Sequence, residues 1–454
     1  MMTHKKIAHS AVLMLATAIF GLNSAQAGIP IEHWTQPSGV QVFLAQSHSI
    51  PMVDVQLDFD AGSRRDPAAQ AGLASVTASM SGKGVLASAS APALDENALG
   101  EAWADLGASF GGGASQDRMS FRLRSLTYPD LLDKAVQLAA RQLGAPAFPA
   151  AIWLRERATL NAALKEANTR PGTLAARAFN TAVYGTHPYG FEMTGATLAP
   201  ISVADMKTFY RTLIQPCRAK VTVVGDVTRA QADGLVTQLF ARLPGAKAGG
   251  HCAALPAVPE VAALTKPVEK NVAFNSAQAH VLIGQPGYKR DDPEYFALTV
   301  GNYILGGGGF VSRLTEEVRE KRGLSYSVSS YFAPGLHAGA FMLGLQTRPD
   351  QAAQAVQVSR DVLANFVANG PTEAELKAAK DNLVGGFALR IDSNRKLLDN
   401  VANIAWYNLP LDYLDSWTQR VAQVSAADIL AAFARKLQPQ TMVTVVLGAP
   451  EAAQ

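Results

Sequence analysis

The sequence is poor in cysteine, has no apolar run long enough to cross a membrane and carries almost no excess of either charge. Its two cysteines, Cys217 and Cys252, lack the CxxC spacing of a redox or zinc motif. In an oxidising compartment they could form one disulfide, or they could remain two isolated thiols, and the sequence leaves both open. The apolar run over residues 11–22 is too short for a bilayer anchor, and no later run exceeds it.

The first 27 residues have the pattern of a secretory signal peptide. Lys5 and Lys6 form its basic end, residues 11–22 form its apolar core, and residues 25–27 (AQA) form a small-residue cleavage site before Gly28. We therefore expect an exported protein without a membrane anchor, located in a bacterial periplasm.

The charge balance excludes one class of partner. Without the predicted signal peptide, which holds two of the 40 basic residues and no acidic one, 38 basic and 37 acidic residues remain, a net charge of +1. No basic run with interleaved aromatics is present, so no nucleic-acid partner is expected. A composition of 48% hydrophobic and 17% charged residues is ordinary for globular proteins, and 454 residues suffice for two or three domains.

Three motifs of the first half recur in the second half, in the same order and at offsets near 220 residues. Thr127-x-Pro-Asp recurs from Thr347, in each case after a strand pattern and before an amphipathic helix pattern. A helix start of the capping type, Ser202-x-x-Asp, recurs from Ser425. The closing strand TVVG at 222–225 recurs as TVVLG at 444–448. Three collinear matches indicate a duplicated domain.

Each copy mixes strand pairs with long helices, which predicts an α+β fold of two homologous α/β-layer domains rather than a doubly wound sheet. A stretch rich in Pro and Ala from about Pro244 to Pro267 is the clearest linker. We expect a first domain over residues 28–245, a linker over 246–268 and a second domain over 269–454. In the first domain, residues 109–125 are predicted to form a strand pair that is broken by the glycines at 111–113.

The densest motif covers residues 306–331, GGGGFVSRLTEEVREKRGLSYSVSSY. The glycine run opens into a helix pattern whose apolar stripe contains Phe310, Leu314 and Val318. Gly323 ends this helix, and residues 324–331 are predicted to form a strand. Glycines before a helix can cradle phosphate, but no GK[ST] follows, so a tight turn with close packing is the better interpretation of the run.

Arg319 and Tyr326 flank the turn between this helix and this strand. Arg319 falls in the last helical turn and Tyr326 lies seven residues later, inside the predicted strand. Both side chains are hydrogen-bond donors that could hold a peptide carbonyl. From composition alone, they could equally be a solvated arginine and a half-buried strand tyrosine.

The segment LTEEVREKRGLSYSV resembles the pitrilysin/insulinase family of metallopeptidases, which includes the mitochondrial processing peptidase and small bacterial two-domain members. DAGSRRDP, GLASVTASM and THPYG in the first half, and QAHVLIGQPG and LGGGG in the second, extend the resemblance over nearly the whole mature chain. It implies two domains of the mitochondrial-processing-peptidase type.

The family's zinc-binding residues are replaced in this chain. Members bind zinc through an inverted HxxEH motif on a helix of the first domain and through a further glutamate downstream. Here Ser75 and Ser79 stand at the histidine positions, Ala78 at the glutamate position and Ala163 at the downstream position. The six histidines of the mature chain have no ligand spacing elsewhere. The resemblance therefore implies that this chain binds no zinc and has no activity of its own.

The other half of the family's machinery is retained. Active members use an Arg and a Tyr, seven residues apart in the second domain, to hold the substrate backbone beside the zinc, and Arg319 and Tyr326 match this pair. In two-subunit members, one chain carries HxxEH and the other carries the Arg and Tyr. The resemblance implies a non-catalytic, substrate-binding subunit of a periplasmic heterodimeric zinc metallopeptidase. Its HxxEH-bearing partner would hold the zinc, and the substrates would be extended peptides.

Two other functions stay open on the sequence. One is a peptide-binding or scaffold protein of the same fold with no peptidase activity, although a scaffold has no need of the Arg319 and Tyr326 pair. The other is a hydrolase that uses Ser75 or Ser79 as nucleophile, for which the sequence shows no base or oxyanion arrangement.

Overall fold

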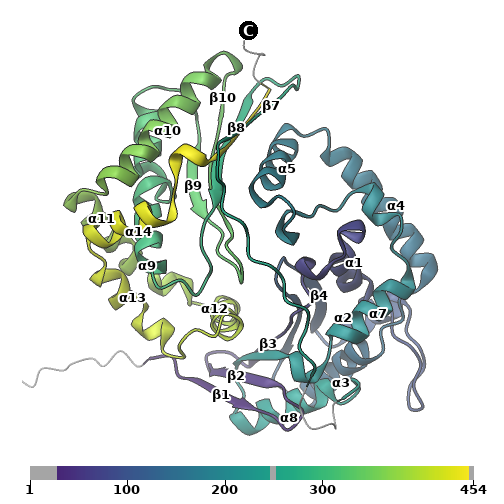
Figure 1. The fold of residues 1–454 in the computed structure, drawn as a ribbon. Helices are drawn as coiled ribbons and strands as arrows, with labels where there is room; N and C mark the ends of the chain where they lie inside the picture. Colours follow the sequence, from purple (N-terminus) through teal and green to yellow (C-terminus); the bar gives the residue numbers. More distant parts are fainter. Residues whose placement is uncertain (1–27, 246–251, 449–454) are drawn as a thin grey trace, which may run out of the picture.

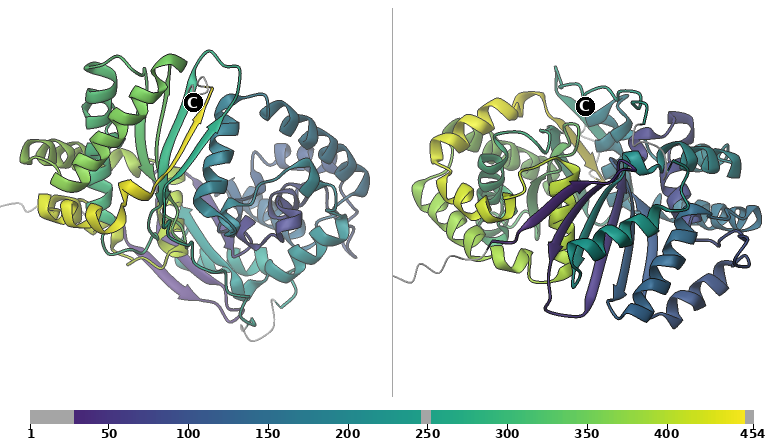
Figure 2. Two further views of the ribbon diagram at one scale, coloured as in Figure 1. Left: turned by 45° about the horizontal axis from the view of Figure 1, so that its top comes forward. Right: turned by 90° about the horizontal axis from the view of Figure 1, so that it is seen from below.

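The computed structural model describes residues 28–245 and 252–448, so the predicted signal peptide lies outside the described residues (Figure 1). Two halves, each a sheet with helices, are joined by an extended segment (Figure 2). Within the described ranges, no helix has the length and apolar character needed to cross a membrane.

The first half forms a six-stranded sheet in the order β1-β2-β6-β3-β5-β4. Its strands are β1 (Ile31–Thr35), β2 (Gln41–Gln46), β3 (Met52–Phe59), β4 (Ser109–Ala114), β5 (Met119–Leu126) and β6 (Lys220–Gly225). Its helices are α1 (Leu73–Met80), α2 (Glu96–Asp105), α3 (Pro129–Gly144), α4 (Ala150–Ala167), α5 (Pro171–Tyr184), α6 (Gly195–Leu198), α7 (Val203–Leu213) and α8 (Arg229–Phe240).

The second half forms a five-stranded sheet in the order β7-β11-β8-β10-β9. Its strands are β7 (Val268–Val272), β8 (Ala279–Pro286), β9 (Val328–Phe332), β10 (Ala340–Thr347) and β11 (Val443–Leu447). Its α-helices are α9 (Tyr295–Asn302), α10 (Ala352–Asn369), α11 (Glu373–Gly385), α12 (Asn394–Trp406), α13 (Tyr413–Gln423) and α14 (Ala426–Lys436).

The two sheets confirm the predicted duplication. Strands β2-β6-β3-β5-β4 correspond one by one to β7-β11-β8-β10-β9: each set begins with a parallel pair and continues with antiparallel pairs. The repeated motifs occupy equivalent places, since Ser202 and Ser425 both form capping boxes, at α7 and α14. The α+β prediction is therefore confirmed.

Each half lends one helix to the sheet of the other half. Helix α5 packs on β11, β8 and β7, and α12 packs on the equivalent strands β6, β3 and β2, as the views in Figures 1 and 2 also show. Phe179 of α5 lies so close to Gly284 of β8 that a Cβ on the glycine would come within 2.9 Å of its ring. Helices α3 and α8 cover the opposite face of the first sheet, while α9, α10 and α14 cover that of the second.

A buried polar network fastens α12 to the first sheet. Arg118, just before β5, reaches the carboxylate of Asp58 on β3 at 3.1 Å and donates to the side-chain oxygen of Asn403 at 2.8 Å. Asp58 is only 1% exposed. Lys220 of β6 donates to the carbonyl of Ala405 at 2.7 Å, where α12 ends. Because cations are favourable at helix C-termini, this contact ties β6 to α12.

The described part of the linker, residues 252–267, has no helix or strand and runs along the first half until β7 begins at Val268. Arg218 donates to the carbonyl of Ala253 at 2.7 Å, and Arg65 donates to that of Pro256 at 2.5 Å. Cys217 and Cys252, which the sequence left open, form a disulfide that closes a separation of 35 residues.

One predicted break is in the wrong place. The glycines at 111–113 were expected to interrupt the strand pair, but all three lie within β4, and the turn falls at residues 115–118. Gly112 faces the core, where a Cβ would come within 2.7 Å of the ring of Phe121. A glycine is needed there because the ring of Phe121 leaves no space for a side chain.

Candidate functional site

The helix that carries zinc in the resembling family is preserved as a helix but has none of the ligands. On α1, Ala78 is buried, Ser75 is half-buried and Ser79 is exposed. The helix begins at Gly72, and the carboxylate of Asp66 accepts hydrogen bonds from the backbone N–H groups of Gly72 and Ala74, both at 2.8 Å. Burial raises the pKa of Asp66 to about 6, against the effect of these hydrogen bonds.

The downstream position does not restore a metal site. Ala163 is exposed on α4, and Glu156 on the same helix is engaged by Arg155 at 2.7 Å and by Lys83 at 3.3 Å. The four family positions are occupied by two serines and two alanines. Their side chains do not fit Zn²⁺, which takes imidazole, thiolate or carboxylate ligands. Over residues 28–245 and 252–448, no cluster of three or more His, Cys, Asp or Glu residues has metal-binding geometry.

A serine nucleophile on α1 has no support in the geometry. In the described part of the chain, neither Ser75 nor Ser79 forms a side-chain hydrogen bond with a histidine or a carboxylate. An unactivated hydroxyl is a weak nucleophile without such a base. The hydrolase alternative therefore loses the arrangement that it would require.

The block that carries Arg319 differs from the regular helix that was predicted. Tyr303–Gly307 and Thr315–Glu320 are π-helical, and Gly309–Val311 is a 3₁₀ turn between them. Leu314 and Val318 are buried as expected, but Phe310 is 72% exposed. The apolar stripe fails at Phe310 because the change of helix type alters the angular spacing of side chains.

The glycine run packs closely, as the sequence suggested. A Cβ on Gly306 would come within 2.5 Å of the Ser330 hydroxyl and within 2.6 Å of the Leu314 side chain. Gly323, which was predicted to end the helix, has a φ of +61°, a left-handed conformation that favours glycine. The close packing of the run and the end of the helix near Gly323 are confirmed, but Gly306 and Gly307 lie in a π-helical segment rather than in a tight turn.

Arg313 anchors this block to α11. Its Nε and Nη2 donate to the two carboxylate oxygens of Glu375 at 2.6 and 2.7 Å, a bidentate pair. Glu375 also forms a capping box with Thr372 at the start of α11. Burial raises the pKa of Glu375, but the hydrogen bonds from Arg313 and Thr372 outweigh it and lower the pKa to about 2. The start of the π-helical segment is thus fixed to the rest of the second half.

The structure brings Arg319 and Tyr326 together. The guanidinium carbon of Arg319 lies 4.7 Å from the ring centre of Tyr326 and 4.6 Å from that of Phe310, so the guanidinium is held between two aromatic rings. Glu320 lies 3.2 Å from its Nε. The role of Phe310 was missed because its position in the apolar stripe assigned it to the core.

Tyr326 is not in a strand, contrary to the prediction. Strand β9 begins at Val328, and Tyr326 lies in the preceding loop with 82% of its surface exposed. The Ser325 hydroxyl donates to the carbonyl of Ser327 at 2.7 Å and accepts from the Ser327 N–H at 3.2 Å. Such local serine hydrogen bonds compete with strand pairing, and they leave Tyr326 at the tip of a turn.

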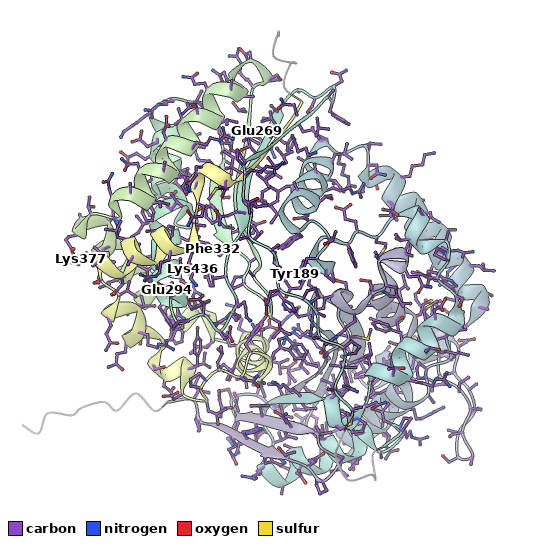
Figure 3. The ribbon with its side chains drawn as sticks, in the orientation of Figure 1. Tyr189, Glu269, Glu294, Phe332, Lys377 and Lys436 are labelled. Atoms are coloured by element: carbon purple, nitrogen blue, oxygen red, sulfur yellow. A yellow bond between two sulfur atoms is a disulfide. The ribbon has the colours of Figure 1, made fainter. Side chains whose placement is uncertain are left out.

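His187 lies in a structural cluster between the halves rather than in a metal site. Tyr189, labelled in Figure 3, donates to Asp117 at 2.5 Å and accepts from the N–H of His337 at 3.2 Å. The Nδ1 of His187 accepts from the Tyr189 N–H, so its Nε2 carries the proton that is donated to the linker carbonyl at residue 259. The cluster holds the linker against both halves.

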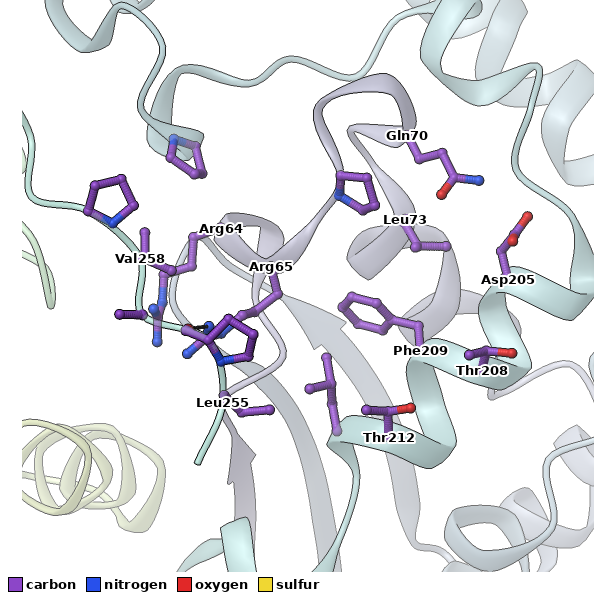
Figure 4. A pocket seen from close by; sticks show the side chains of 16 residues that line it. Arg64, Arg65, Gln70, Leu73, Asp205, Thr208, Phe209, Thr212, Leu255 and Val258 are labelled. Carbon is purple, nitrogen blue, oxygen red and sulfur yellow. Dashed lines mark hydrogen bonds between the residues drawn. The ribbon is translucent and has the colours of Figure 1, made fainter. Parts of the chain in front are cut away.

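A cavity of about 560 Å³ lies between the linker and α7 (Figure 4). Its walls are mainly apolar, with Leu73, Phe209 and Leu255 among them. Arg64 and Arg65 at one end both bind the carboxylate of Asp60. Neither Arg319 nor Tyr326 lines this cavity.

Comparisons with known proteins match this picture. The model of the insulinase family (peptidase family M16) matches residues 41–197, and a model described as the peptidase M16 inactive domain matches residues 200–383. The crystal structure of a peptidase M16 inactive domain from Pseudomonas fluorescens superposes with a TM-score of 0.86 at 34% identity, covering 93% of this chain and 99% of that one.

Two curated relatives differ in what their names say. The chain is 30% identical over 268 residues to an uncharacterized zinc protease from Streptomyces coelicolor. The aligned region covers 58% of this chain and only 57% of that protein. It is 24% identical over 398 residues to a protein from Helicobacter pylori named a non-peptidase homolog, covering 86% of this chain and 87% of that protein.

Proposed function

We propose, from the premise that this chain belongs to the insulinase family (peptidase family M16), that it is the non-catalytic, substrate-binding subunit of a periplasmic heterodimeric zinc metallopeptidase. The observation that carries the proposal is Arg319, whose guanidinium lies against the rings of Phe310 and Tyr326. The replaced ligand positions on α1 support the lack of intrinsic activity, as do the relatives described as an inactive domain and a non-peptidase homolog. The predicted signal peptide supports the periplasmic location.

In the proposed complex, the zinc and its general base belong to the HxxEH motif of the partner. An extended peptide would add to an edge strand of the partner's sheet through main-chain hydrogen bonds. Arg319 and Tyr326 would donate to peptide carbonyl oxygens near the scissile bond, where negative charge develops. Since the guanidinium is already stacked, little side-chain freedom would be lost on binding.

The first experiment is a pull-down of the tagged mature chain from its native periplasm, with mass spectrometry of the co-purifying chains. A chain of similar size with HxxEH supports the proposal. Recovery of no such chain, under conditions that preserve complexes, would favour a peptide-binding or scaffold protein of the same fold. The edge strand β4, which pairs with β5 alone among the described strands, would then be the candidate peptide site.

The second experiment uses the purified pair. Arg319→Ala and Tyr326→Phe should each lower kcat/KM about a hundredfold, the typical loss for one oxyanion donor of about 3 kcal/mol. The zinc content of the pair should not change. Arg322→Ala is the matched control, because Arg322 lies in the same block but pairs with Glu317. Equal activity of the Arg319 and control variants would refute the assigned role.

A further inference from the structure

A polar cavity of about 330 Å³ opens on the second sheet beside Tyr326. It is continuous with the site already described, because Tyr326 itself forms part of the wall. The hydrogen-bonding side chains of its lining are Gln278, His280, Tyr326, Ser327, Ser329 and Gln346.

The cavity exists because residue 344, at its centre, is a glycine. The strand register places Gly344 of β10 between Ser329 of β9 and Leu282 of β8, and places Gln346 beside His280 in an adjacent row. A Cβ on Gly344 would come within 3.2 Å of the Leu282 side chain, so a side chain there would occupy the cavity. We call this cavity the Gly344 pocket.

The lining of the Gly344 pocket is polar but carries no formal charge. It contains no lysine, arginine, aspartate or glutamate. Burial lowers the pKa of His280, so the imidazole is neutral at neutral pH. None of the six hydrogen-bonding side chains donates to or accepts from another side chain within the described residues, and their hydrogen-bonding capacity is therefore available to a ligand.

We propose that the Gly344 pocket receives one side chain of the peptide held by Arg319 and Tyr326, and that it selects an uncharged amide side chain, glutamine or asparagine. The inference rests on the proposed function, since it names the substrate class of the same site. An extended peptide directs alternate side chains to one face, so a peptide lying along Tyr326 presents a side chain to the pocket.

The preference follows from the cost of each kind of side chain. An amide both donates and accepts, as the hydroxyl, imidazole and amide groups of the lining do. A charged side chain would lose hydration without meeting an opposite charge. An apolar side chain would forgo these hydrogen bonds and would displace water from His280, the half-buried member of the lining.

The test uses the purified mature chain and a set of short fluorescein-labelled peptides, with binding followed by fluorescence polarisation. Each peptide has an alanine–serine background and one guest residue, glutamine, leucine or glutamate, which is moved through every position. We expect one position at which glutamine binds about tenfold more tightly than leucine or glutamate. Gly344→Val, which fills the pocket, should abolish this preference.

Gln346→Leu, a change at an exposed position, should also reduce the preference and covers the case in which Gly344→Val fails to fold. Arg319→Ala should weaken all peptides alike, and Arg322→Ala should change nothing. A binding loss on Arg319→Ala without any guest preference, or a preference that survives both pocket variants, would overturn the pocket alone. Indifference to Arg319→Ala, or no saturable binding of any peptide, would overturn the pocket, while the proposed function is tested separately by the pull-down and by kcat/KM of the purified pair.

Discussion

Replacing Arg118 by methionine should destabilise the protein by about 3–5 kcal/mol, because it leaves a buried carboxylate without its cation. The partner, Asp58, is 1% exposed, and its oxygen lies 3.1 Å from the Arg118 guanidinium. At an effective dielectric constant of about 20, this distance corresponds to roughly 5 kcal/mol of attraction. Hydrogen bonds from Ser120 and Gln56 remain and offset part of the loss.

The assay is urea denaturation followed by circular dichroism. Asp58→Asn in the Arg118→Met background should restore all but about 1 kcal/mol, because it removes the unpaired charge. Burial already raises the pKa of Asp58, so the deficit of the single variant should shrink as the pH falls and the carboxyl takes up a proton. Arg348→Met is the control, because it removes an arginine from an exposed ion pair.

Arg348 pairs with Asp350 at 2.6 Å, and both side chains are more than half exposed. The control should therefore cost at most about 1 kcal/mol. If Arg118→Met costs no more than Arg348→Met, or if Asp58→Asn gives no recovery, the buried charge of Asp58 does not fasten α12 to the first sheet. The account of how the halves are joined would then be wrong.

Three further predictions concern the block that carries the Arg/Tyr pair and the linker. Phe310→Ala removes one stacking ring from Arg319 and should lower kcat/KM of the purified pair about fivefold at constant zinc content; an unchanged rate would contradict the stack's role. Burial alone would raise the pKa of Glu375, but the hydrogen bonds from Arg313 and Thr372 lower it to about 2. The ion pair therefore stabilises the fold at pH values above the ordinary pKa of 4.5, and this stabilisation is lost as the pH falls toward 2. Glu375→Gln should thus be about 1–2 kcal/mol less stable in urea at pH 7, allowing for solvent screening, and equal to the parent near pH 2. Cys217→Ser should lower the free energy of unfolding by about 3–4 kcal/mol in the chain-entropy account, and a reductant should abolish the difference.

The duplication could be predicted because its information is local and repeated. A capping box at Ser202 and another at Ser425 each satisfy backbone donors within one turn, so they can be recognised from a few residues. The exchange of α5 and α12 between the halves could not be predicted in this way. An amphipathic helix shows which of its faces is buried, but not which of two equivalent sheets buries it.

The local geometry of the Arg/Tyr site was predicted less well than its composition. The resemblance to the family identified Arg319 and Tyr326 as a pair, but the period-based interpretation put Phe310 in the core and Tyr326 in a strand. Both errors have one physical cause, since π-helical turns and the hydrogen bonds of Ser325 are local departures from the regular periods on which such predictions depend.

The exposure of the two rings that contact Arg319 is what a surface covered in the proposed complex would show. Phe310 is 72% and Tyr326 is 82% exposed, so neither contributes much to the core. Helix α1, by contrast, keeps its buried residues while its zinc positions are replaced, because packing on the sheet does not require the ligands. Folding alone accounts for α1, but folding gains little from two exposed rings around one guanidinium. In the proposed complex, the peptide and the partner would bury these two rings. Protection of residues 309–327 from hydrogen exchange on addition of the partner would test this directly.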